Sequence, residues 1–306
     1  MCRRHDPGEG HPEDARRLAA IEDRLISTGL LDLLSHFDAP EITDEQVLRI
    51  HSPGYVSMLS TVEPSEGHFR LDPDTVMSPG SLSAARRAAG AVVRAVDLVM
   101  SGIVDNAFCS VRPPGHHAER SQAMGFCLFN NVAAGAAHVL AEYDLQRVAI
   151  LDFDVHHGNG TEDIFLDDQR VLFCSTFQHP FYPFTPLLED APNRVSVPLD
   201  ADAGSEEFRA AVNGRWLPAL ERFQPEMIFV SAGFDAHCDD DMSNVCLVDD
   251  DFRWVSGLIV EQAARWSSGR IVSTLEGGYE YLSLARCAEL HLRALMGLDS
   301  ASLPNR

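Results

Sequence analysis

The chain has 306 residues, 45% of them hydrophobic, and a formal net charge of −22; this length and composition suit a globular protein with a substantial core. So acidic a surface repels phosphate backbones and argues against nucleic-acid binding, and no apolar run is long enough to cross a bilayer. Residues 1–14 are polar and lack a secretion signal, which predicts a cytoplasmic protein.

The seven cysteines are scattered along the chain, and none lies in a CxxC motif. That pattern argues against both a disulfide framework and a cysteine zinc site. Cys109 and Cys174 lie within apolar runs, so we expect them to be small core residues.

Helical and strand-like patterns alternate along the chain. Ser81 has the position of an N-cap, and apolar residues at helical spacing continue to a stop near Gly102. Strands are expected at 106–111, 147–153, 171–175, 227–231 and 270–275, and further helices at 131–143, 206–223, 250–266 and 282–295. This pattern predicts an α/β fold with three layers, α/β/α, around a mostly parallel sheet. We expect residues 1–306 to form a single domain, with long loops at 62–79 and 180–192 around its site.

Each of the five expected strands leads into a polar segment at its carboxyl end. The segments are RPPGHH after Val111, DFDVHHGNG after Leu151, CSTF at Phe173, SAGFDAH after Val230 and LEGGYE after Thr274. Ligands of open α/β sheets bind beyond the carboxyl ends of the strands. The five segments therefore predict one shared site.

Asp152, Asp154 and His156 alternate in sequence, so a strand would direct all three side chains to one face. Two carboxylates and an imidazole without sulfur suit Zn²⁺ or a similar divalent ion. Asp235, beyond another strand, would be the third protein ligand beside Asp154 and His156. The structural alternative is a hydrogen-bonded Asp–His network that holds no metal.

Two further segments carry groups suited to hydrolysis. His116 and His117 follow a stiff Pro-Pro-Gly turn, and such a pair could take and return a proton near neutral pH. Tyr279 follows Gly277-Gly278 and could donate a hydrogen bond to a developing oxyanion. Each motif alone is a weak signal, because tandem histidines are more often surface residues.

Together these segments resemble the histone deacetylase family, and its class II and bacterial branch above all. The resemblance covers nearly the whole chain in the family's order. It rests on HDPGEGHPE (5–13), RPPGHHA (112–118), GFCLFNN (125–131), LDFDVHHGNGTEDIF (151–165), SAGFDAH (231–237) and LEGGYE (275–280).

The resemblance implies an arginase/deacetylase-like sheet and a zinc-dependent deacylase acting on acetyl-lysine or another acylated amine. The implied zinc ligands are Asp154, His156 and Asp235, and Fe²⁺ would suit the same donors. The implied acid/base pair is His116, held by Asp152, and His117, held by Asn159, with His117 the base and Tyr279 polarising the carbonyl. Other branches carry an aspartate at the position of Asn159, so the two histidines should differ in basicity.

Two further sets of residues follow from the same resemblance. A structural K⁺ would be bound by Asp152, by the backbone oxygens of Asp154, His156 and Thr176, and by the hydroxyl of Ser175. A narrow tunnel for an alkyl amine would be lined by Gly125, Phe126, Tyr182, Met242 and Gly278.

The sequence departs from the family at two places. Many relatives have Asp-Pro after the third zinc ligand and then a rim residue, which is a glutamate in polyamine-selective members. Here the run is Asp240-Asp241-Met242, which favours acyl-lysine over acetylpolyamine. Only four residues precede His5, where relatives have a strand, so we expect either a missing strand or a late start.

Three alternatives stay open. The first is an amidohydrolase of acetylpolyamines or other small acetylamines. The second is a catalytically weak acyl-lysine binding module, although every expected catalytic residue is present. The third is an arginase-like two-metal hydrolase, because residues 235–239 read DAHxD. A homo-oligomer is compatible with each of them.

Overall fold

The computed structural model describes residues 2–188 and 191–298. Its centre is a six-stranded sheet in the order β3-β8-β7-β4-β5-β6, in which every pairing is parallel. The strands are β3 (Asn106–Cys109), β4 (Val148–Asp152), β5 (Val171–Gln178), β6 (Arg194–Leu199), β7 (Met227–Ala232) and β8 (Ile271–Leu275). The four central strands are buried along their whole length, as their continuous apolar runs predict.

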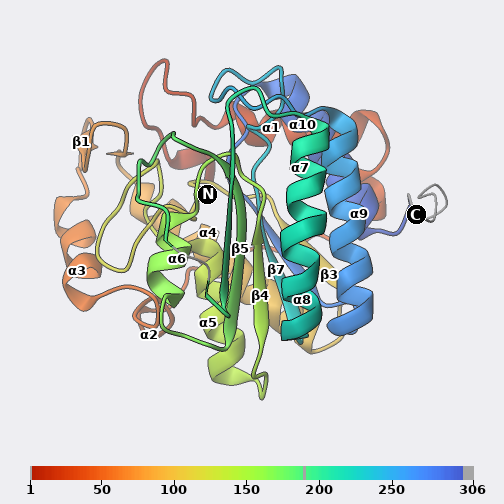
Figure 1. The fold of residues 1–306 in the computed structure, drawn as a ribbon. Coiled ribbons are helices and arrows are strands. Elements are labelled where there is room, and N and C mark those ends of the chain that lie inside the picture. The colour runs from red at the N-terminus through yellow and green to blue at the C-terminus, as the bar shows by residue number, and fades with distance from the viewer. Residues whose placement is uncertain (1, 189–190, 299–306) are drawn as a thin grey trace.

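Helices cover both faces of this sheet (Figure 1), so the expected three-layer α/β/α fold is confirmed. One face packs against α1 (Arg16–Ser27), α7 (Ser205–Ala211), the π-helical turn η3 (Val212–Trp216), α8 (Leu217–Phe223), α9 (Asp249–Trp266) and α10 (Tyr281–Leu295). The other face packs against α2 (Asp44–Val47), α3 (Pro53–Val62), α4 (Ser81–Met100), α5 (Asn131–Glu142) and α6 (Asn159–Phe165). Cys109 and Cys174 are buried in these two cores, as predicted.

The expected helices and strands appear, and the structure differs from expectation in one loop and at both edges of the sheet. Strand β6 was not predicted, because Pro198 interrupts its pattern; an edge strand tolerates proline, and β6 is at the end of the sheet. The expected loop at 62–79 contains a short antiparallel pair, β1 (Phe69–Arg70) and β2 (Val76–Met77). Of the expected buried strand 106–111 only 106–109 is strand, and it is half-buried because β3 is the other edge.

The prediction that Ser81 is an N-cap is wrong. Gly80 occupies that position with φ of 88°, and Ser81 is the first residue of α4. The Ser81 hydroxyl instead accepts the backbone N–H of Ser78 and hydrogen-bonds Nδ1 of His5 at 2.7 Å. The serine therefore ties the N-terminal segment to the start of α4.

Two strand ends also differ from expectation in ways that concern the site. Strand β4 ends at Asp152, and residues 154–156 lie in a bend beyond it, so strand alternation does not direct Asp154 and His156. Strand β5 continues to Gln178, which places Ser175 and Thr176 inside the strand. Ser175 is paired in register with Asp152.

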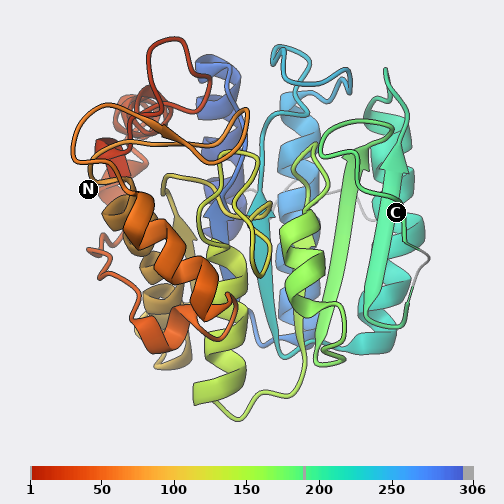
Figure 2. The same ribbon diagram turned by 90° about the vertical axis from the view of Figure 1, so that its left-hand side faces the viewer.

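Loops from the red, orange and yellow parts of the chain lie together at one end of the sheet (Figure 2). Residues 2–4 form the 3-10 helix η1 (Cys2–Arg4), and a second 3-10 turn is η2 (Leu31–Leu33). None of the described helices is both long and apolar enough to span a membrane.

Candidate active site

The segments after β4 and β7 bring together three side chains that could hold a metal ion. Ligand atoms of Asp154, His156 and Asp235 all lie within 4.8 Å of one another, and all three residues are buried. Nδ1 of His156 is 3.1 Å from Oδ1 of Asp154 and 3.2 Å from Oδ2 of Asp235. Apart from this contact with His156, that Oδ2 atom is buried and has no hydrogen-bond partner within the described chain. Two buried carboxylates and one imidazole this close together fit a divalent cation.

Two glycines lie directly against this cluster. A Cβ atom on Gly233 or Gly277 would overlap Oδ2 of Asp154. The N–H of Gly277 donates to the same oxygen at 2.8 Å. Glycine at these two positions therefore lets neighbouring strand ends close around the carboxylates.

The histidine pair after β3 faces this cluster. The rings of His116 and His117 are 4.0 Å apart, and the His117 ring is 5.8 Å from that of His156. Nε2 of His116 is 3.7 Å from Oδ1 of Asp154. Both histidines are buried, so the structure brings together the five residues proposed as metal ligands and acid/base groups.

The Nδ1 atom of each histidine contacts a different partner. His116 Nδ1 is 3.0 Å from Oδ2 of Asp152. His117 Nδ1 is 2.7 Å from Oδ1 of Asn159, whose amide group donates to Glu119 at 2.8 Å. Because that amide uses its N–H on a carboxylate, its oxygen accepts, and His117 Nδ1 must donate. The lone pair of neutral His117 is then on Nε2, which suits a base.

Protein charges separate the pKa values of the two histidines. Burial lowers the pKa of His116, but the carboxylates of Asp154 and Asp152 outweigh it and raise it to about 10. Burial, together with the positive charges of His116 and His156, holds the pKa of His117 well below its ordinary value. The two histidines thus differ in basicity, in the direction that neutral Asn159 and charged Asp152 predict.

Glu276 is a site residue that the sequence reasoning missed. Its Oε2 accepts the N–H groups of Gly115 at 2.6 Å and His116 at 3.1 Å, and the Ser231 hydroxyl donates to Oε1 at 3.2 Å. Burial raises the pKa of Glu276 to about 7, against the charge of His116. The fully buried Glu276 side chain therefore holds the loop that carries His116. In the sequence, the signal that could have identified it is an acidic residue directly after an apolar strand.

Tyr279 packs beside a buried arginine that was also missed. The Arg17 guanidinium lies 4.8 Å from the centre of the Tyr279 ring and donates to the carbonyl oxygens of Gly278 at 2.6 Å and Glu276 at 2.5 Å. Burial raises the pKa of Tyr279 well above its usual value, so its hydroxyl stays a donor. The fully buried Arg17 lies on the apolar face of α1, which hides its role in the sequence.

A second charged pair supports Arg17 from the N-terminal segment. Glu13 Oε1 is 3.3 Å from Nη1 of Arg17, and the Arg112 guanidinium donates to both Glu13 oxygens. All three side chains are buried. Burial raises the pKa of Glu13, but Arg112 outweighs it and the pKa is lowered. The motif at 5–13 therefore joins the site through Glu13.

Two of the expected tunnel aromatics contact the site. The Tyr182 ring is 5.3 Å from His117 and 6.0 Å from His156, and the Phe126 ring is 5.9 Å from Tyr279. Phe181, which was not predicted, stacks on His156 at 5.7 Å.

The remaining expected tunnel residues have different surroundings. Gly125 and Gly278 have φ of 56° and 116°, and a Cβ on Gly125 would overlap the His117 ring. Met242 is half-buried, and its N–H donates to Asp240 at 3.1 Å; its place at the rim stays a prediction.

Two of the residues proposed to hold potassium carry buried hydroxyl groups: that of Ser175 was a proposed ligand, whereas Thr176 was expected to offer its backbone oxygen. Ser175 Oγ and Thr176 Oγ1 have no hydrogen-bond partner in the part of the chain that the structure describes. Unpartnered buried oxygens fit a hard cation, which takes oxygen ligands. Asp152 lies opposite Ser175 in the sheet, so these three residues share one region.

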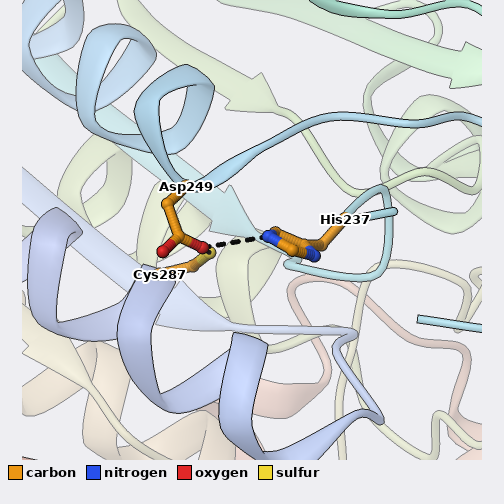
Figure 3. Close-up of side chains that lie close together, drawn as sticks. All are labelled: His237, Asp249 and Cys287. Carbon is orange, nitrogen blue, oxygen red and sulfur yellow. Dashed lines mark hydrogen bonds and ion pairs between the residues drawn. The ribbon is translucent and has the colours of Figure 1, made fainter. Parts of the chain in front are cut away.

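A second cluster is formed by His237, Asp249 and Cys287 (Figure 3). His237 Nδ1 accepts the N–H of Asp239 at 3.0 Å, so its proton is on Nε2, which donates to Asp249 at 2.9 Å. Arg286 pairs with the same carboxylate at 2.9 Å. His237 and Asp249 therefore belong to a hydrogen-bonded network. His237, Cys238 and Asp239 of the DAHxD run also lie close enough together to hold an ion, so the two-metal alternative stays open.

Known proteins resemble this chain over almost its whole length. The histone deacetylase domain family matches residues 11–295. A histone deacetylase-like amidohydrolase of Pseudomonas aeruginosa is 37% identical over 95% of this chain and 77% of its own length. The mouse polyamine deacetylase HDAC10 is 36% identical over 95% of this chain, which spans only 46% of that protein. The crystal structure of the HDA15 HD domain superposes with a TM-score of 0.88 at 31% identity, covering 97% of this chain and 89% of that one.

Proposed function

This chain belongs to the histone deacetylase family, and from that premise we propose that it is a zinc-dependent deacylase. Its substrate would be the amide of N-acetyl-lysine or a similar acylated alkyl amine. One observation carries the proposal: three side chains that could hold a metal, a histidine pair with separate partners and a half-buried tyrosine come from four strand ends to one place.

The metal would be held by Asp154, His156 and Asp235. Their nitrogen and oxygen donors suit Zn²⁺ first, and Fe²⁺ would also fit. When bound, such an ion polarises a carbonyl and lowers the pKa of water at the site. A structural K⁺ at Ser175, Thr176 and Asp152, with Asp154 and His156 beside it, would hold the strand ends that carry these ligands.

His117 would act as the base that takes a proton from the attacking water. Asn159 orients its ring so that the Nε2 lone pair is available. His116, fixed by Asp152, would be the second member that returns a proton to the leaving amine. The hydroxyl of Tyr279 would donate to the oxyanion that develops on the carbonyl. Water attacks directly, so no covalent bond to the protein is required.

The substrate would enter as an alkyl chain. The rings of Tyr182 and Phe126, near His117 and Tyr279, offer apolar walls for methylene groups. A polyamine deacetylase is among the relatives, so acetylpolyamine is the second candidate. Met242, in place of a glutamate at the predicted rim, favours acyl-lysine.

We also propose one catalytic domain over residues 1–306, acting in the cytoplasm.

A substrate panel tests the proposal. The protein would be given an acetyl-lysine peptide, acetylputrescine and longer acyl-lysine peptides at equal concentration, with and without a hydroxamate that chelates the metal. We expect hydroxamate-sensitive release of acetate, with the peptide turned over faster than acetylputrescine. The reverse order would establish the polyamine alternative. Saturable binding of the peptide without turnover would establish the binding module, and undiminished deacylation by a Tyr279→Phe, His117→Ala double variant would overturn the mechanism.

A further inference from the structure

A single peptide group precedes the tyrosine of the proposed site, and it is held at both ends. Its carbonyl oxygen, on Gly278, accepts from Nε of Arg17 at 2.6 Å. Its N–H, on Tyr279, donates to Oδ2 of Asp240 at 2.6 Å, and the N–H of Glu280 donates to the same oxygen at 3.0 Å. A cation and an anion from distant segments thus fix the plane of this peptide.

Asp240 is a buried carboxylate without a cationic partner among the described residues. It is 5% exposed, and the ion pairs of the described chain nearby involve Asp239 and Asp249 instead. Its oxygens accept backbone N–H groups, with Oδ1 bonding Met242 at 3.1 Å. Burial, then the charge of Asp235, raises the pKa of Asp240 to about 6. A buried charge of this kind is costly unless its acceptors are needed.

The backbone before Tyr279 has little stiffness of its own. Gly277 and Gly278 come in tandem, and Gly278 has φ of 116°, a conformation that side-chain-bearing residues rarely adopt. Small displacements of a catalytic group cost large factors in rate. A charged acceptor on the N–H of Tyr279 would restrict the rotation that these glycines allow.

We infer that Asp240 is a positioning residue, which fixes the hydroxyl of Tyr279 by holding the backbone N–H groups of Tyr279 and Glu280. Asp240 lies five residues beyond Asp235, on the segment between β7 and α9. That segment would therefore supply both a metal ligand and the anchor of the oxyanion donor. The expected effect on catalysis rests on the proposed function, whereas the hold of Asp240 on the backbone of Tyr279 does not depend on it.

The test compares Asp240→Asn with Asp241→Asn, a matched change at an exposed neighbour. The amide keeps an acceptor but replaces the other oxygen with a donor group, so the two N–H groups lose their shared anion. We expect kcat to fall about 10- to 100-fold in Asp240→Asn, with KM and bound metal unchanged, and no effect of Asp241→Asn. In a Tyr279→Phe background the same change should cost less than twofold, because its route through the hydroxyl is gone.

A second readout needs no turnover. In protein labelled with fluorotyrosine, the fluorine resonance missing from Tyr279→Phe identifies Tyr279 among the five tyrosines. We expect Asp240→Asn to shift or broaden that resonance and Asp241→Asn to leave it unchanged. Asp240→Glu, which keeps the charge at a greater length, replaces Asp240→Asn if the latter does not fold.

The outcomes separate the two proposals. An unchanged resonance together with unchanged kcat overturns the role of Asp240. An equal loss of kcat in the presence and absence of the Tyr279 hydroxyl also overturns it, since Asp240 would then act elsewhere. A wild-type protein that hydrolyses no amide, but whose Tyr279 resonance responds to Asp240→Asn, contradicts the proposed function while supporting the positioning role.

Discussion

Gly277 lies against Asp235 so closely that a Cβ atom on the glycine would overlap Oδ2 of the carboxylate. This is the oxygen without a hydrogen-bond partner in the described chain. We expect Gly277→Ala to displace it and to weaken zinc binding at least about tenfold, as a shifted ligand does. Metal content after dialysis measures this. Gly54→Ala, whose Cβ would meet nothing within 4 Å, is the control and should keep its metal.

His117 is the proposed base, and its removal should affect rate more than folding. We expect His117→Ala to lower kcat by about 10²- to 10⁴-fold, with metal content retained because the ligands are other residues. Steady-state kinetics with an acetyl-lysine peptide checks this. His36→Ala, at an exposed histidine, should behave as wild type. Activity of His117→Ala within a factor of two of wild type would rule out the assignment.

One metal ion per chain is expected, at the cluster of Asp154, His156 and Asp235. Asp235→Asn should reduce the bound zinc measured by mass spectrometry of the native protein, since it removes an anionic ligand. Cys287→Ser should leave one ion bound, because His237 and Asp249 are committed to hydrogen bonds. Two transition-metal ions per chain, one of them lost in Cys287→Ser, would contradict this assignment.

Potassium should stabilise the folded protein. Replacing Na⁺ by K⁺ at constant ionic strength is expected to raise the melting temperature by several degrees, since a ligand that binds only the folded state adds to its stability. Ser175→Ala should remove most of that difference. Thr274→Val is the matched control, because Thr274 also has a buried hydroxyl without a partner in the described chain but is not a proposed ligand. An identical K⁺ response in wild type and Ser175→Ala would exclude the site.

Acid should destabilise the fold through His291, which lies buried between the hydroxyls of Ser256 and Ser273. Burial lowers its pKa to about 3. The unfolded chain therefore binds a proton at pH values where the folded chain does not. The free energy of unfolding is unaffected above about pH 6.5 and falls as the pH drops toward 3.

We expect His291→Gln to reduce the slope of this fall by up to about 1.4 kcal/mol per pH unit. Urea unfolding between pH 6.5 and 4.5, with a chelator present so that metal release does not contribute, measures the slope. His36→Gln, at an exposed histidine, is the control and should keep the wild-type slope. A wild-type slope in His291→Gln would contradict the prediction, because it would mean that His291 is charged in the folded protein.

The sequence predicted much of the fold because its signals are local. Continuous apolar runs such as 227–231 are typical of strands buried on both faces, and the residue types at 152–156 indicate a metal site. The wrong predictions also came from local rules, used at positions where those rules do not hold. Alternation along a strand does not apply beyond Asp152, where β4 ends, and a serine after Gly80 is no cap when the glycine takes that place.

The sequence by itself determined which chemical groups follow which strands, and hence the family, since residue types and their order are written along the chain. Only the tertiary structure decided how those groups are held. Glu276 bonds His116 across 160 residues, Arg17 bonds Gly278 across 261, and Asp240 bonds Tyr279 across 39. Hydrogen bonds of this kind leave no periodic trace in a sequence, because they depend on where the strands of the folded sheet end.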